Sequence, residues 1–146
     1  MSLKIDLKPG EKIIVNGAVL KAGKRRVTLI LENEAMLLRG KDVMTEAEAN
    51  TPARRIYFTT MLLYITGGDA QTRARFDQFV DDFLGATAVR ELRAALLEIR
   101  RDVDAGRHYH AMKTCKWLIQ IEAKLLKLGT DMPVEVPEPT SLQEAT

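Results

Sequence analysis

The sequence predicts an α+β fold, in which a small N-terminal antiparallel β-meander packs on a C-terminal bundle of about four helices. Short apolar runs separated by turn dipeptides fill residues 1–40, whereas apolar stripes of helical period fill residues 51–130. The length of 146 residues is about that of one domain. We therefore expect a single folded domain over residues 1–131, followed by a disordered acidic tail over residues 132–146.

The first forty residues alternate short apolar runs with turns. Strands are predicted at residues 3–8, 12–15, 18–20, 26–31 and 35–38. Asn16-Gly17, between the second and third runs, is a strong hairpin signal because both residues of the tight turn need positive φ. Pro9-Gly10 marks another turn. So small a sheet buries too little apolar surface to be stable alone, and we expect it to pack on the helices, on another subunit, or on both.

Residues 51–66 form the predicted central helix. Thr51 suits the N-cap, and Pro52 fits the first turn, where a missing N–H costs nothing. Gly67-Gly68 can supply the positive φ of a helix exit. Apolar residues fall on nearly every side of the helix between residues 56 and 65, which is typical of a buried helix.

Three amphipathic helices are predicted after the central one. Asp69 is expected to cap a helix that Gly85 ends, Thr87 to cap the next, and the last to run from about residue 107 to residue 128. The second helix carries an apolar stripe of Phe76, Phe79, Val80, Phe83 and Leu84. The third carries a heptad-like seam of Val89, Leu92, Leu96, Ile99 and Val103. Both patterns fit core packing, and the seam fits a dimer interface equally well.

The sequence offers little for catalysis. Cys115 is the only cysteine, so no internal disulfide can form, which indicates a cytoplasmic protein. It lies on an apolar stripe, whereas a nucleophilic thiol needs a neighbouring base. His108 and His110 are two residues apart and point to different faces of a helix, while a metal site needs three or four converging ligands. We therefore expect no enzyme activity, no catalytic residues, no cofactor and no metal, and no membrane-spanning segment is apparent.

The net charge of +2 is small but unevenly distributed. Residues 1–65 carry 11 Lys/Arg against 7 Asp/Glu, whereas residues 66–131 carry 11 against 10. Residues 132–146 carry three acids and no base. A local basic excess attracts anionic partners such as nucleic acid. The basic residues of the first part are therefore the candidate functional residues.

The candidate RNA-binding residues lie at the predicted strand ends and at the start of the central helix. They are Lys21, Lys24, Arg25, Arg26, Arg39, Lys41, Arg54 and Arg55. Charges at sheet edges also serve to block unwanted strand pairing, which is the alternative for those near the strands. Arg54 and Arg55 occupy a first helical turn, where the helix dipole disfavours cations, and this indicates either an anionic partner or an ion pair.

Three segments resemble one known family. Leu7-Lys8-Pro9-Gly10-Glu11-Lys12, continuing through Val15-Asn16-Gly17-Ala18-Val19, is similar to the start of the FlbT family of flagellin regulators. Thr51-Pro52-Ala53-Arg54-Arg55-Ile56-Tyr57-Phe58 resembles the second signature of that family, and Arg107-His108-Tyr109-His110-Ala111-Met112-Lys113 resembles a third. The order and spacing of the segments agree as well, and together they cover most of residues 1–128.

The resemblance implies a cytoplasmic repressor of flagellin synthesis that takes part in bacterial flagellum biogenesis. Such a protein would bind the 5′ untranslated region of flagellin mRNA and reduce translation or message stability, although some relatives act positively. FlaF is implied as a counteracting partner, and the family supplies no catalytic residues. The alternative is a protein-binding module that grips flagellin or FlaF through the helical seam and regulates the mRNA indirectly. The basic skew favours the first interpretation and the long apolar seams favour the second, while a homo-oligomer stays open.

We predict that the purified, untagged protein contains no structural zinc, because His108, His110 and Cys115 are its only soft candidate ligands and the two histidines diverge. Elemental analysis should find far less than one zinc per chain. A stoichiometric amount that survives dialysis would contradict the prediction.

Overall fold

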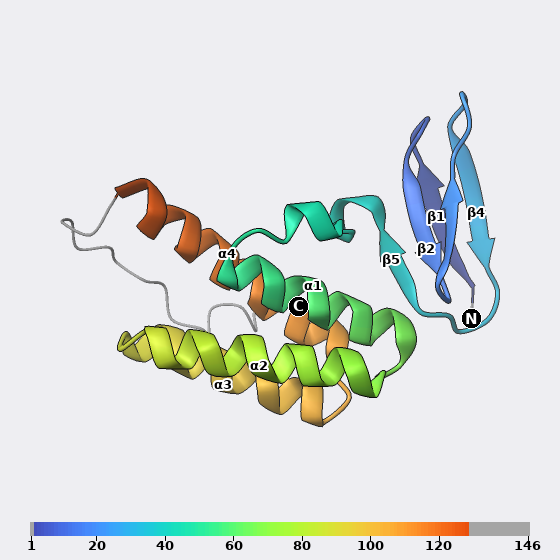
Figure 1. The fold of residues 1–146 in the computed structure, drawn as a ribbon. Coiled ribbons are helices and arrows are strands. Elements are labelled where there is room, and N and C mark those ends of the chain that lie inside the picture. The colour runs from blue at the N-terminus through green and yellow to red at the C-terminus, as the bar shows by residue number, and fades with distance from the viewer. Residues whose placement is uncertain (1, 129–146) are drawn as a thin grey trace. The chain divides into compact units, whose positions relative to one another are not determined.

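The computed structural model describes residues 2–128 and confirms the α+β class (Figure 1). Five antiparallel strands come first in the chain and four helices follow. The chain divides into two compact units, residues 1–43 and residues 44–146. The predicted tail, residues 132–146, lies outside the described residues.

The strands of the first unit form two small sheets. Their bounds are β1 Leu3–Leu7, β2 Lys12–Val15, β3 Ala18–Lys21, β4 Val27–Leu31 and β5 Leu37–Arg39. One sheet pairs β1 with β4, and the other has the order β3-β2-β5. The buried cluster of Ile5, Leu7, Ile13 and Ala22 packs with half-buried side chains of β2, β4 and β5, so it draws on both sheets. The two sheets thus cover each other's apolar faces.

The strand connections differ from those of the predicted meander. Only the β2–β3 hairpin joins two strands adjacent in sequence, around Asn16 and Gly17, whose φ values are 50° and 85°. The Pro9-Gly10 turn does not fold β2 back onto β1. Instead, the Gly10 N–H donates to the carbonyls of Ala22 and Gly23, both at 3.1 Å, in the loop before β4. That loop therefore brings β4, rather than β2, alongside β1.

Between residues 44 and 128 the second unit is built from four helices, α1 Pro52–Thr66, α2 Ala70–Ala86, α3 Arg90–Asp104 and α4 His108–Leu128. A 3-10 turn, η2 Glu46–Glu48, precedes them, and another, η1 Gly40–Asp42, ends the first unit. Helix α1 packs against α2 and α4, and α3 packs against α4 and α2.

Helix α1 confirms the predicted central helix in its ends and its burial. The Thr51 hydroxyl accepts from the Arg54 N–H at 3.2 Å, Pro52 occupies the first turn, and Gly67 ends the helix with φ 76°. Its buried side chains are Ala53, Ile56, Tyr57, Phe58, Thr59, Thr60, Met61 and Leu63. Thr60 is satisfied inside the core because its hydroxyl donates to the Ile56 carbonyl at 2.7 Å.

The junction between α2 and α3 differs from the prediction. Gly85 does not end α2, since the Thr87 N–H donates to the Phe83 carbonyl and Thr87 is the C-cap of α2 rather than the N-cap of α3. The Arg93 guanidinium donates to the carbonyls of Leu84, at 2.5 Å, and Thr87, at 3.1 Å. A side chain from α3 thus satisfies carbonyls that a helix end leaves open, so a glycine exit is not required.

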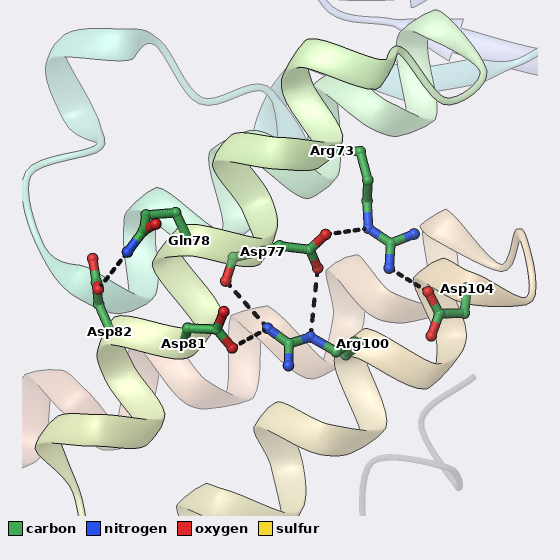
Figure 2. A network of polar contacts seen from close by, with 7 residues as sticks. All are labelled: Arg73, Asp77, Gln78, Asp81, Asp82, Arg100 and Asp104. Carbon is green, nitrogen blue, oxygen red and sulfur yellow. Dashed lines mark hydrogen bonds and ion pairs between the residues drawn. The ribbon is translucent and has the colours of Figure 1, made fainter.

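Ion pairs join α2 to α3 along one side (Figure 2). The Arg100 guanidinium contacts Asp81 at 2.7 Å and Asp77 at 3.5 Å, and Arg73 contacts Asp77 at 3.2 Å. Arg73 also pairs with Asp104 of α3. These groups are partly exposed, so each pair contributes little alone, and their sharing of Asp77 and Arg73 orients the two helices.

Asp102 ties α3 to α4 from a buried position. Its Oδ1 accepts from Nε and Nη2 of Arg107, at 3.1 and 3.0 Å, and its Oδ2 lies 2.7 Å from His110 Nδ1. The Asp102 carbonyl also accepts from the Arg107 N–H at 2.8 Å. A buried carboxylate is costly unless its oxygens are paired, and here both are paired across the α3–α4 turn.

We predict that Asp102→Ala lowers the free energy of unfolding by about 2–4 kcal/mol, because it removes a charged acceptor from a buried network. Asp104→Ala is the matched control: Asp104 is an exposed neighbour, and its removal should cost roughly 1 kcal/mol or less. Urea denaturation of both variants measures the difference. Equal stability of the two variants would show that the Asp102 network does not hold the turn.

Candidate nucleic-acid interface

The strand register gathers basic side chains at one end of the first unit. Lys12 of β2 lies directly opposite Lys21 of β3. Leu7 of β1 lies opposite Val27 of β4, so the next residues outward are Lys8 and Arg26. Both pairs stand at the same end, because the turn at Gly10 leads from β1 to β2 and bonds to the loop that leads from β3 to β4.

That loop supplies two further cations. Its first residue is held in place by a bond from the Ala22 N–H to the Glu11 carbonyl at 2.8 Å. Lys24 and Arg25 follow and are exposed. We name as the basic end the exposed residues Lys8, Lys12, Lys21, Lys24, Arg25 and Arg26. Four of these six were predicted as RNA-binding residues. Lys8 and Lys12 were not, although their polar positions beside the Pro9-Gly10 turn could have indicated that they lie at the same end of the strands.

Arg39 and Lys41 border the basic end on the β5 side. Arg39 lies opposite Ile13, and its guanidinium contacts the Glu11 carboxylate at 3.1 Å and the Asp6 carbonyl at 2.7 Å. Gly40 comes next, and a Cβ there would lie 2.8 Å from the Lys12 carbonyl, so only glycine fits against β2. Lys41, which is exposed, follows that close approach.

Glu11 is the acid at the centre of this end, and it is already engaged. The Lys8 N–H donates to its carboxylate at 2.9 Å, and this bond, together with the Arg39 guanidinium, lowers the pKa of Glu11. The carboxylate thus stays ionised and oriented toward Arg39. Arg39 is therefore less available to an outside anion than the six exposed cations.

The basic end carries an electrostatic cost that the fold does not offset internally. Residues 1–43 contain nine Lys/Arg and five Asp/Glu, and every base except Lys4 lies at this end or borders it. Lys12 and Lys21 lie directly opposite each other on neighbouring strands. Like charges in such positions repel each other and destabilise the sheet. Such a cost is offset when an anion binds, so this end of the sheets is suited to phosphate groups.

Arg54 and Arg55 belong to the helical unit. Arg54 is half-buried and Arg55 is exposed, and both lie in the first turn of α1. Neither guanidinium takes part in an ion pair with any residue from 2 to 128. No salt bridge among the described residues is thus formed there, although Arg54 is among the groups that lower the pKa of Glu48, after the hydrogen bonds from Thr45. Of the eight predicted RNA-binding residues, the six in the first unit lie at or beside the basic end. Arg54 and Arg55 lie in the other unit.

The residues considered for catalysis, Cys115, His108 and His110, are buried or half-buried within the helical unit. Cys115 is fully buried with its sulfur 3.7 Å from the Thr60 hydroxyl, and burial raises the pKa of the thiol to about 12. Burial also lowers the pKa of His108, while His110 contacts Asp102. Within residues 2–128 no three His, Cys, Asp or Glu side chains are placed to hold a metal. In the same range, every helix is too short or too polar to cross a membrane.

The α3 seam is used inside the chain. Leu92, Leu96, Ile99 and Val103 are buried, and Val89, at the N-cap, is exposed. The α2 stripe is only partly core, since Phe76 and Val80 are buried whereas Phe79, Phe83 and Leu84 are half-buried. The core interpretation of the seam therefore accounts for four of its five residues. The same four are unavailable to a partner in the folded chain.

Comparisons with known proteins identify relatives over most of the chain. The family model described as "Flagellar protein FlbT" matches residues 3–126. The chain is 40% identical over 129 residues to the "Probable flagellum biosynthesis repressor protein FlbT" of Caulobacter sp. (strain K31), covering 86% of this chain and 97% of the relative. It is 37% identical to the "Flagellum biosynthesis repressor protein FlbT" of Caulobacter vibrioides (strain ATCC 19089 / CIP 103742 / CB 15), covering 86% and 90%. No solved structure matches significantly.

The Lys12–Lys21 pair generates a stability prediction. Lys21→Glu should raise the free energy of unfolding by about 0.2–1 kcal/mol, because it converts a cross-strand repulsion into an attraction. Lys4→Glu makes the same charge change opposite Ile30, where no charged partner stands, and serves as the control. Urea denaturation at low salt compares the two variants. A Lys21→Glu protein that is no more stable than the control would mean that the repulsion is absent.

Proposed function

The chain belongs to the FlbT family of flagellar proteins, and on that premise we propose that it is a cytoplasmic repressor of flagellin synthesis that binds the 5′ untranslated region of flagellin mRNA. Binding there reduces translation of the message or shortens its lifetime. Relatives with 37–40% identity are named flagellum biosynthesis repressors, which supports the biological role. The observation that supports RNA as the ligand is the uncompensated charge of the basic end.

The basic end supports contact with the RNA backbone rather than base stacking. Residues 1–43 contain no Phe, Tyr or Trp, so this unit offers no aromatic platform for bases. Lysine and arginine at adjacent strand ends reach phosphates, which position an RNA but carry no sequence information. Selectivity for one leader then comes from the shape of a folded or single-stranded element, and affinity comes from counterion release.

The unpaired guanidiniums of Arg54 and Arg55 supply a second cationic patch, in the helical unit. The amide N–H groups of this turn are already engaged: the Ala53 N–H donates to Glu122 at 2.9 Å and the Arg54 N–H to Thr51. An anion there would therefore meet side chains and not the backbone. This patch supports a role in RNA binding that is secondary to the basic end.

The alternative is a protein-binding module that grips flagellin or FlaF and regulates the mRNA indirectly. The helical seam that first favoured it is mostly buried in the chain. Its remaining support is the half-buried aromatic pair of α2, Phe79 and Phe83. FlaF is therefore included as a component in the binding test.

We predict that Lys24→Ala, Arg25→Ala and Arg26→Ala together weaken binding of purified protein to labelled flagellin leader RNA. The log–log dependence of affinity on salt should flatten by about 0.7 for each single-strand phosphate that the variant no longer neutralises. The control replaces Arg75, Arg90 and Arg101 with alanine, which removes the same charge from exposed positions on α2 and α3. Fluorescence anisotropy from low to high salt measures both.

The control should keep the affinity and salt slope of the unchanged protein. If the folded basic-end variant binds as the control does, the proposed surface is wrong. If the unchanged protein binds leader RNA only when FlaF is added, the direct mechanism is wrong and the protein-binding alternative is favoured.

A further inference from the structure

A half-open apolar pocket lies between the start of α1 and the end of α2. It has a volume of about 330 Å³, near the lower limit for pockets that hold a ligand. Its walls are formed by Pro52, Arg55, Phe79, Asp82, Phe83 and Ala86. Two phenylalanines of a stripe that predicts core packing are thus left with their rings partly open, and an apolar group seated between them would complete the burial.

The rim of this pocket carries two charges of opposite sign, Arg55 and Asp82, and Arg55 is the one that attracts an anion. Asp82 accepts from the Gln78 side chain at 2.8 Å and is turned toward it (Figure 2). Arg55 is exposed and makes no ion pair with any described residue. The occupant that fits is therefore a segment with an apolar side chain and a carboxylate close to it in sequence.

The end of α4 lies beside the same turn of α1. Glu122 accepts from the Ala53 N–H at 2.9 Å, and Ala53 is the residue after Pro52 of the pocket wall. Leu128 ends α4 six residues later, about 9 Å further along the helix at 1.5 Å per residue. An extended chain spans about 3.3 Å per residue, so the eight residues from Leu128 to Val136 span about 26 Å, well over the length of helix between Glu122 and Leu128.

The sequence after Leu128 has the matching chemistry. Residues 129–146 carry Asp131, Glu135, Glu138 and Glu144 and neither lysine nor arginine. Met132, Val134 and Val136 alternate with other residues, and Glu135 stands between the two valines. In an extended segment, side chains two apart share a face, so Met132, Val134, Val136 and Glu138 would lie on one face and Glu135 on the other.

We propose that this pocket binds residues 132–138 of the same chain, with an apolar side chain between Phe79 and Phe83 and a glutamate on Arg55. The tail then covers one of the two arginines of the α1 patch and acts there as an internal competitor for other anions. The tethered segment needs little intrinsic affinity, because a short connection gives it an effective concentration in the millimolar range. The inference does not depend on RNA binding.

Photo-crosslinking of the full chain tests the occupant. Phe83→benzoylphenylalanine places the reactive group in the pocket wall, and irradiation should link it to residues 129–146 of the same chain. Mixing ¹⁵N-labelled with unlabelled protein distinguishes links within a chain from links between copies by mass spectrometry. Leu97→benzoylphenylalanine, at an exposed position on α3, is the control and should give no such product. Links to another copy, to another segment, or to nothing would overturn the proposal.

A charge exchange tests the role of Arg55 in the same protein. Arg55→Glu should lower the yield of the tail crosslink at least fivefold, and adding Glu135→Lys and Glu138→Lys should restore it to within twofold. Arg75→Glu makes the same charge change elsewhere on the helical unit and should leave the yield unchanged. If Arg55→Glu leaves the crosslink yield unchanged, or if the two lysine substitutions do not restore a lowered yield, Arg55 does not hold the tail.

Discussion

The hydrogen bonds from the Gly10 N–H to the carbonyls of Ala22 and Gly23 set the arrangement of the first unit. They join the turn after β1 to the loop before β4 and so commit β1 to pair with β4 across two intervening strands. With that pairing made, the ends of all five strands that carry lysine or arginine lie together. The clustering of positive charge in the unit thus depends on backbone topology and register as well as on the basic run Lys24-Arg25-Arg26.

This arrangement costs stability that a protein without an anionic partner could avoid. Lys12 and Lys21 face each other in a sheet where most pairs of residue types would be more favourable, and Glu11 is held by Arg39 instead of lying between them. Elsewhere in the chain, by contrast, α2 and α3 share five charged residues in one network of ion pairs. Ion pairs are therefore numerous where they orient helices and few at the basic end. That contrast is the main physical reason to assign function to the cations left unpaired.

In the helical unit the same turn of α1 serves packing and binding. Thr51 and Pro52 start the helix, and the Ala53 N–H donates to Glu122 of α4. The side chains of Arg54 and Arg55 form no ion pair with any described residue. Because α1 is buried over most of its length, its start is held firmly and its arginines project from a fixed base. The pocket beside Arg55 lies between this helix start and the end of α2, where Phe79, Phe83 and Ala86 form part of its wall.

The sequence by itself determined the fold class, the central helix and most of the candidate site, because these depend on local signals. Asn16-Gly17 demands positive φ, Thr51-Pro52 suits a helix start, and an apolar surface all round a helix requires burial. Only the tertiary structure decided which strands pair, how α2 ends and where the charges gather. Those outcomes depend on contacts between different elements, such as Gly10 with Ala22 and Arg93 with Leu84. A local pattern cannot encode such contacts, since the same turn and strand signals are compatible with several pairings until the apolar faces of the sheets are buried against one another.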